Sequence, residues 1–181
     1  KRDMFVHMKK HELDSDFFIS KNKLVCDTAY TKKKSNDPSG ILVCKYYKNS
    51  LYLMDFYETW SEAPEVLKIM RRLMVQHNAD AAYIENKASG MSIAQTARTI
   101  EGINAIDYKQ TMDDKEARLI KELPMIEASR VIIVWSEDNK DRMEHFLHCI
   151  INFPDATIHD EAVDTLTMAT ALSNKHKSNR K

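Results

Sequence analysis

The sequence predicts an α/β protein with a mixed central sheet flanked by helices. Apolar, β-branched segments at 23–29, 41–47 and 51–58 are predicted as strands, and the short connection at 48–50 favours an antiparallel hairpin. Beyond residue 60, short apolar strands alternate with segments whose apolar residues recur at helical spacing. Antiparallel strands followed by helical crossovers produce a sheet of mixed direction.

Each later element has a local signal. The first helix is predicted from Ser61, a favourable N-cap, through Pro64 in its first turn to about His77. Ser89 can cap a second helix, which Gly102 ends. The remaining strands are predicted at 81–85, 105–108 and 131–134, and the remaining helices at about 113–128, 138–150 and 158–173.

Composition limits the class of protein and of partner. The chain has 181 residues, of which 43% are hydrophobic and 30% charged, as expected for one globular domain. Lys+Arg and Asp+Glu both total 27, so binding to a polyanion would need a local basic patch. No apolar segment approaches the roughly 18 residues of a membrane helix, and no glycine-rich nucleotide loop is present in the sequence.

Residues 22–173 are predicted to form the folded domain. Residues 1–21 are expected to be an N-terminal extension or linker remnant, and the polar, basic segment 174–181 a disordered tail. The absence of an initiator methionine indicates a fragment of a longer chain. Cys26, Cys44 and Cys149 are odd in number and far apart, which favours free thiols and a reducing compartment.

Acidic side chains stand at the ends of several predicted elements. Asp27 and Glu85 each follow the apolar part of a predicted strand, and Asp160 opens the last helix. Catalytic sites of mixed α/β sheets form at strand ends and adjacent helix starts. Asp160 and Asp164 are four residues apart and share a helix face, whereas Glu161 is expected to point about 100° away. Asp27, Glu85, Asp160 and Asp164 can therefore line one pocket.

Such a cluster favours a metal site, although each acid has a simpler explanation. Carboxylates repel one another unless cations neutralise them, and hard ions such as Mg²⁺ or Mn²⁺ prefer oxygen ligands. Taken singly, Asp160 could be a helix cap, Asp27 a turn residue and Glu85 a solvated strand end. His145, His148 and Cys149 lack a second ligand pair, so no zinc site is predicted there.

Five sequence blocks resemble a known family. VCDTAYTKKKSNDPSGILV, LYLMDFYETW, YIENKASGMSIAQTAR, DDKEARL and FPDATIHDEAVDTLTMA follow one another within residues 22–172. In order and spacing they resemble the nuclease domain of phage large terminase subunits. The resemblance implies a ribonuclease H-like fold and a metal-dependent endonuclease that cuts concatemeric viral double-stranded DNA during genome packaging. The implied chemistry is phosphodiester hydrolysis with two Mg²⁺ or Mn²⁺ ions.

The resemblance also implies partners and a location. In the family an ATPase motor domain precedes the nuclease on the same full-length chain, and the small terminase subunit and the portal take part in packaging. The expected substrate is double-stranded DNA in the cytoplasm of the infected bacterial host, with no membrane partner. A non-catalytic domain that docks DNA or partners, and a nuclease of the same fold that acts on junctions or RNA–DNA hybrids, are the alternatives.

Carried over residue by residue, the family pattern assigns three metal ligands. Asp27 would be the ligand on the first strand of the fold, Glu85 the acid of the IEN strand, and Asp160 the ligand on the last helix. Many members have aspartate where this chain has Glu161. Whether Asp160, Glu161 or Asp164 completes the site is therefore left open, with Asp160 preferred and Asp164 second.

Basic residues near these acids are candidate DNA contacts. Lysines just beyond Asp27 and Glu85 suit sequence-independent phosphate contact, although a solvated charge run would look the same. A second basic pair matches the family's DK-x-x-R block and could instead pair with acids such as Asp114. The predicted DNA-binding residues are Lys32, Lys33, Lys34, Lys87, Lys115 and Arg118.

Overall fold

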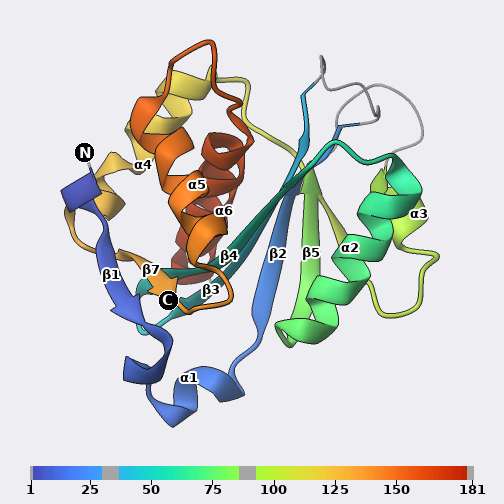
Figure 1. Ribbon diagram of the computed structural model, residues 1–181, viewed down its shortest axis with the longest axis horizontal. Coiled ribbons are helices and arrows are strands. Elements are labelled where there is room, and N and C mark those ends of the chain that lie inside the picture. The colour runs from blue at the N-terminus through green and yellow to red at the C-terminus, as the bar shows by residue number, and fades with distance from the viewer. Residues whose placement is uncertain (1, 30–36, 86–92, 179–181) are drawn as a thin grey trace.

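The computed structural model describes residues 2–29, 37–85 and 93–178 (Figure 1). The strands of this part of the chain are β1 (Val6–Lys9), β2 (Asn22–Asp27), β3 (Ser39–Tyr47), β4 (Ser50–Thr59), β5 (Ala79–Glu85), β6 (Ala105–Tyr108) and β7 (Val131–Trp135). They form one seven-stranded sheet in the order β1-β7-β4-β3-β2-β5-β6.

The sheet has the mixed direction that the sequence predicts. β2, β3 and β4 are antiparallel neighbours, whereas β5 and β6 run parallel to β2, and β7 runs parallel to β4. Lys48 and Asn49, both with positive φ (42° and 68°), join the paired residues Tyr47 and Ser50. Such a two-residue turn matches the twist of the flanking strands, so it sets the register of the β3–β4 hairpin.

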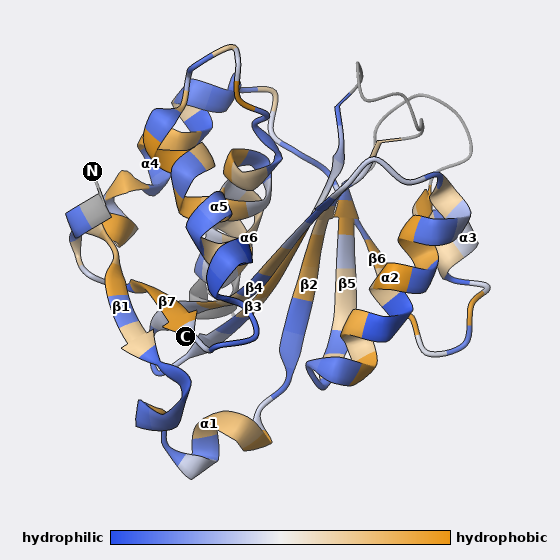
Figure 2. Cartoon of the chain, in the orientation of Figure 1, coloured by the Kyte–Doolittle hydropathy of each residue, from blue (hydrophilic) through white to orange (hydrophobic). Residues whose placement is uncertain are grey.

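Helices cover both faces of the sheet (Figure 1). One face packs against α1 (Ser15–Ile19), α2 (Ala63–Gln76) and α3 (Ile93–Ala97), and the other against α4 (Lys115–Glu127), α5 (Lys140–Asn152) and α6 (Glu161–Ser178). Figure 2 shows the apolar residues of the central strands enclosed between these helices. The predicted α/β class with a mixed central sheet flanked by helices is confirmed.

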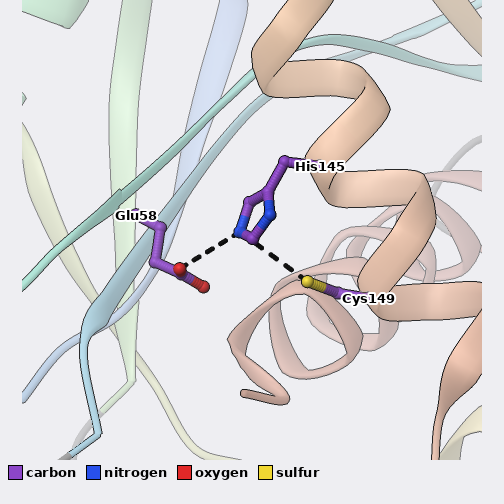
Figure 3. A group of neighbouring side chains, drawn as sticks. All are labelled: Glu58, His145 and Cys149. Carbon is purple, nitrogen blue, oxygen red and sulfur yellow. Dashed lines mark hydrogen bonds and ion pairs between the residues drawn. The ribbon is translucent and has the colours of Figure 1, made fainter. Parts of the chain in front are cut away.

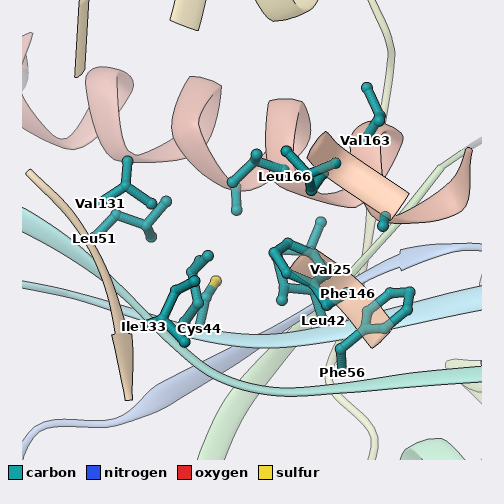
Figure 4. Close-up of a cluster of buried hydrophobic side chains, with 14 of the residues drawn as sticks. Val25, Leu42, Cys44, Leu51, Phe56, Val131, Ile133, Phe146, Val163 and Leu166 are labelled. Atoms are coloured by element: carbon teal, nitrogen blue, oxygen red, sulfur yellow. The ribbon is translucent and has the colours of Figure 1, made fainter. Parts of the chain in front are cut away.

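The alternation of side chains along β2 determines where its terminal acid points. Leu24 and Cys26 belong to the apolar cluster under α2, and Val25 belongs to the cluster under α6. Successive side chains of a strand point to opposite faces. Asp27 therefore faces α6, on the side of the sheet whose apolar cluster is drawn in Figure 4.

α6 is the central helix of its layer and is buried on nearly every side from residue 161 to residue 170. Its threonines tolerate this burial because their hydroxyls donate to backbone carbonyls of the preceding turn. Thr165 donates to the Glu161 carbonyl at 2.8 Å, and Thr170 donates to the Leu166 carbonyl at 3.0 Å. Each buried hydroxyl is thus satisfied inside the helix, so the helix can lie between α4, α5 and the sheet.

Several boundaries differ from the prediction. The first 21 residues were expected as an extension, yet β1 pairs in parallel with β7 at the sheet edge, with Val6 opposite Ile132. α6 begins at Glu161 rather than at residue 158, and it continues to Ser178, beyond the predicted end at 173. α3 ends at Ala97, before the stop that the sequence predicts at Gly102, and the predicted cap Ser89 lies outside the described residues.

Candidate metal centre

One end of the sheet carries a row of acids on neighbouring strands. Asp27 of β2 lies opposite Gly40 of β3, and Gly40 lies opposite Glu58 of β4. On the other side of β2, the parallel register with β5 places Glu85 beside Asp27, since the preceding residues of the two strands are paired. Glu85, Asp27, Gly40 and Glu58 therefore stand at one level of the sheet. Asp27 and Glu85 lie at strand ends, as predicted.

Gly40 leaves a gap in this row, and Glu161 fills it. A methyl group on Gly40 would lie 2.7 Å from the Glu161 Cβ, so the first residue of α6 rests directly on β3. Glycine within a strand often marks such a close approach of another backbone. The row thereby gains a fourth acid, which lies beside Asp27.

The expectation that Glu161 points away from the site is wrong. Its side chain is buried, with 3% of the residue exposed. The rotation of about 100° per residue applies only within a helix. Asp160 precedes α6, so the direction of its side chain gives no measure of the direction of Glu161.

The electrostatic surroundings of Glu161 favour a bound cation. Burial, together with the charges of Asp27, Asp160 and Glu58, raises the pKa of Glu161 to about 8. Its Oε2 atom is buried and has no hydrogen-bond partner within the described ranges. A buried carboxylate that lacks compensation is costly unless it is protonated or meets a positive charge. The donor set at this end of the sheet therefore fits a hard divalent ion.

The other two candidate acids, Asp160 just before α6 and Asp164 within it, already have cationic partners. Lys115 Nζ lies 2.5 Å from Asp160 Oδ1 and 2.8 Å from Asp164 Oδ2, and Arg118 Nη2 lies 2.7 Å from Asp164 Oδ1. Burial raises the pKa of Asp164, against the opposing effect of Lys115 and Arg118. Of the three acids left open by the sequence, the geometry favours Glu161 as the one that completes the site.

The predicted DNA contacts divide into two groups. Arg118 is buried and its guanidinium pairs with Asp164, which speaks against direct contact with DNA and favours the alternative of pairing with an acid. That acid is not Asp114, whose carboxylate instead caps α4 by accepting from the Ala117 amide at 2.8 Å. Lys115 is half-exposed. The predicted contacts Lys32, Lys33, Lys34 and Lys87 lie outside the described residues.

Two further side chains near the start of α6 could bind a metal. Ligand atoms of Asp37, His159 and Glu161 lie within 4.8 Å of one another. An open pocket of about 430 Å³, lined in part by Asp37, Lys115, His159 and Asp160, lies beside this helix start. Asp37 and Glu58 were not predicted as site residues, although both lie within the family-like sequence blocks and Glu58 ends the strand predicted at 51–58.

Comparison with known proteins identifies the family. The family model described as the terminase RNaseH-like domain matches residues 24–172. The chain belongs to this terminase family. The ribonuclease H-like fold implied by the sequence blocks is thereby confirmed, and it supports a nuclease role in DNA packaging.

Solved terminase nuclease domains share the fold of this family member. The human cytomegalovirus domain is 14% identical with a TM-score of 0.65, covering 94% of this chain and 92% of that one. The thermophilic phage G20c nuclease with bound zinc is also 14% identical with a TM-score of 0.65, covering 94% and 95%. The bacteriophage SPP1 domain with bound Mn is 11% identical with a TM-score of 0.57, covering 92% and 96%.

The search of curated proteins returned no match. Within the described part of this terminase domain, no helix has the length and hydropathy needed to cross a membrane.

Proposed function

We propose that this terminase domain is a metal-dependent endonuclease that cuts concatemeric viral double-stranded DNA during genome packaging. The observation that carries the proposal is the meeting of Asp27, Glu85 and Glu161 at one end of the sheet. These acids come from two strands and one helix start, and Glu161 is buried among negative charges. Membership of the terminase family supports the same assignment.

Asp27, Glu85 and Glu161 would hold Mg²⁺ or Mn²⁺, with two ions expected for phosphodiester hydrolysis. The solved relatives that contain Mn support divalent-metal use. When bound, the ions would activate water and neutralise charge developing on the phosphate. Lys115 borders the neighbouring pocket, where its ammonium, oriented by Asp160, would contact a phosphate oxygen.

Cleavage of supercoiled plasmid in Mn²⁺ tests the proposal. Wild type should nick and linearise the plasmid, whereas Asp27→Ala and Glu161→Gln should lose cutting because each removes a charged ligand. Asp160→Asn is the matched control. Asp160 orients the Lys115 ammonium and is not one of the proposed metal ligands, so this variant should keep partial activity. Equal cutting by wild type and Asp27→Ala would contradict the assignment.

The melting temperature of Asp27→Ala without metal distinguishes an acid that binds metal from an acid that stabilises the fold. Removing Asp27 relieves repulsion with Glu161, so the melting temperature of Asp27→Ala without metal should stay level or rise. A clear fall would show that Asp27 supports the fold instead.

Substrate comparison tests the finer assignment. Linear duplex should be cut faster than a four-way junction or an RNA–DNA hybrid. Faster cutting of the junction or hybrid would favour a resolvase or hybrid nuclease of the same fold, and salt-sensitive DNA binding without cleavage would favour a docking domain.

The packaging context is part of the proposal. An ATPase motor domain on the same full-length chain, the small terminase subunit and the portal would be the partners of this domain, in the cytoplasm of the infected bacterial host. The formal net charge of zero predicts weak DNA binding by this domain alone. Tight binding would then require those partners.

A further inference from the structure

Three side chains at the Glu58 end of the acidic row carry the donor atoms of a different kind of site (Figure 3). Glu58 projects from β4, and His145 and Cys149 project from α5. His145 Nε2 lies 3.1 Å from Glu58 Oε2 and 3.7 Å from Cys149 Sγ. Ligand atoms of all three residues lie within 4.8 Å of one another.

We infer that Glu58, His145 and Cys149 bind a divalent transition-metal ion of the Zn²⁺ class. Both contacts of the imidazole involve the same nitrogen. A hydrogen-bonded catalytic triad instead uses one ring nitrogen for the nucleophile and the other for the acid. Convergence of one oxygen, one nitrogen and one sulfur atom is instead an arrangement in which the three atoms can share a metal ion.

The spacing of the donor atoms fits tetrahedral zinc. With Zn–S about 2.3 Å and Zn–N and Zn–O about 2.1 Å, tetrahedral angles place sulfur and nitrogen about 3.6 Å apart, and nitrogen and oxygen about 3.4 Å apart. The 3.7 Å and 3.1 Å separations of Cys149 and Glu58 from His145 Nε2 are close to these values. A metal could therefore be bound with small side-chain movements.

Burial and solvent access also suit a bound ion. The Glu58 side chain is only 9% exposed, and its Oε1 atom is buried with no hydrogen-bond partner among the residues that the structure covers. Cys149 is buried, whereas the His145 side chain is 47% exposed. Solvent can thus reach the site beside the imidazole and supply a fourth ligand.

The donor chemistry separates this site from the acidic one. Thiolate and imidazole ligands favour zinc and related ions, whereas carboxylates alone favour Mg²⁺ or Mn²⁺. His145 and Cys149 are four residues apart on one face of α5, and Glu58 belongs to the facing strand. A bound ion would therefore link α5 to the sheet.

Sequence spacing alone argued against zinc here because it offered no second ligand pair. The structure supplies the missing ligand from β4, 87 positions before His145. His148 is not part of the cluster, because its ring contacts the Asn152 amide instead. Binding requires a deprotonated thiol and a free Nε2 lone pair, so the protons of both groups are released to solvent and affinity should rise with pH.

Titration of the 181-residue chain with Co²⁺ in excess Mg²⁺ tests the inference. The Mg²⁺ occupies sites made of carboxylates alone, and the absorption spectrum of bound Co²⁺ shows whether a sulfur atom is among its ligands. Wild type should develop a thiolate-to-cobalt charge-transfer band that Zn²⁺ abolishes. Cys149→Ser should lose the band, and His145→Ala should weaken Zn²⁺ binding at least tenfold. No band in wild type, or a band that persists in Cys149→Ser, would overturn the inference.

Two matched controls make the result specific. His148→Ala removes a neighbouring imidazole and should bind Zn²⁺ like wild type. Asp27→Ala should lose nuclease activity yet keep the cobalt–thiolate band, so failure of this inference and failure of the proposed function are distinguishable.

Thermal unfolding covers the case in which Cys149→Ser does not fold. His145 is half-exposed, so His145→Ala should fold and retain the thiol. Zn²⁺ should raise the melting temperature of wild type and have little effect on His145→Ala, since only a ligand that binds the folded state stabilises it. Equal stabilisation of the two proteins would also overturn the inference.

Discussion

Replacing Gly40 with alanine tests whether α6 is positioned by direct contact with β3. The new methyl carbon would lie 2.7 Å from the Glu161 Cβ, whereas carbon atoms pack best at about 3.5–4.0 Å, so the start of α6 must move by about 1 Å. Overpacking of this kind costs about 1–3 kcal/mol. Without a clash, Gly→Ala would instead stabilise the folded protein by about 0.4–1 kcal/mol, because alanine lowers the conformational entropy of the unfolded chain.

The net loss expected for Gly40→Ala is about 1–2 kcal/mol, or a fall in melting temperature of about 2–8 °C, measured by circular dichroism. Metal-dependent cleavage should fall by up to about 100-fold, because ligands displaced by 1 Å no longer share an ion. The clash involves Cβ, so a Glu161→Ala background should not relieve it, whereas a Glu161→Gly background should. Neutral or increased stability of Gly40→Ala would refute the proposed contact.

Further predictions concern the charges around α6. The pKa of Glu161 is raised from 4.5 to about 8, so without metal the wild type should lose stability as pH rises from 4.5 to 8, by up to about 4 kcal/mol, measured as urea unfolding at pH 5 and pH 8. Glu161→Gln should remove this slope, and an unchanged slope would contradict the assignment. Arg118→Ala should destabilise by about 1.5–3 kcal/mol, because the buried Asp164 loses one charged hydrogen-bond partner and keeps Lys115. A double-mutant cycle with Asp164→Asn should show strong coupling rather than additivity. Lys115→Met should weaken DNA binding and reduce its salt dependence, whereas an unaltered salt slope would exclude a phosphate contact.

Much of the fold follows from local sequence signals. β6 has the predicted bounds of 105–108, and the β3–β4 hairpin follows from the turn at Lys48 and Asn49. β1 could not be predicted in this way, because a segment of only four residues gives little signal even when its side chains alternate. Its place is determined by pairing with β7, which lies more than 120 positions away in the sequence.

The candidate site is predictable only where a local rule determines side-chain direction. Asp27 and Glu85 end buried strands, so their positions follow from the strand pattern. The direction of Glu161 depends on where α6 begins and on its contact with Gly40, 121 positions earlier. Glu58 likewise gains its neighbours His145 and Cys149 only through packing of α5 on β4.

A crystal of the domain soaked in Mn²⁺ would show which acids hold the ion. Anomalous density for Mn²⁺ is expected within bonding distance of Asp27, Glu85 and Glu161 carboxylate oxygens, with Lys115 still paired to Asp160. Mn²⁺ bound by Asp160 with Glu161 uncoordinated, or no Mn²⁺ at this end of the sheet, would contradict this assignment of the ligands.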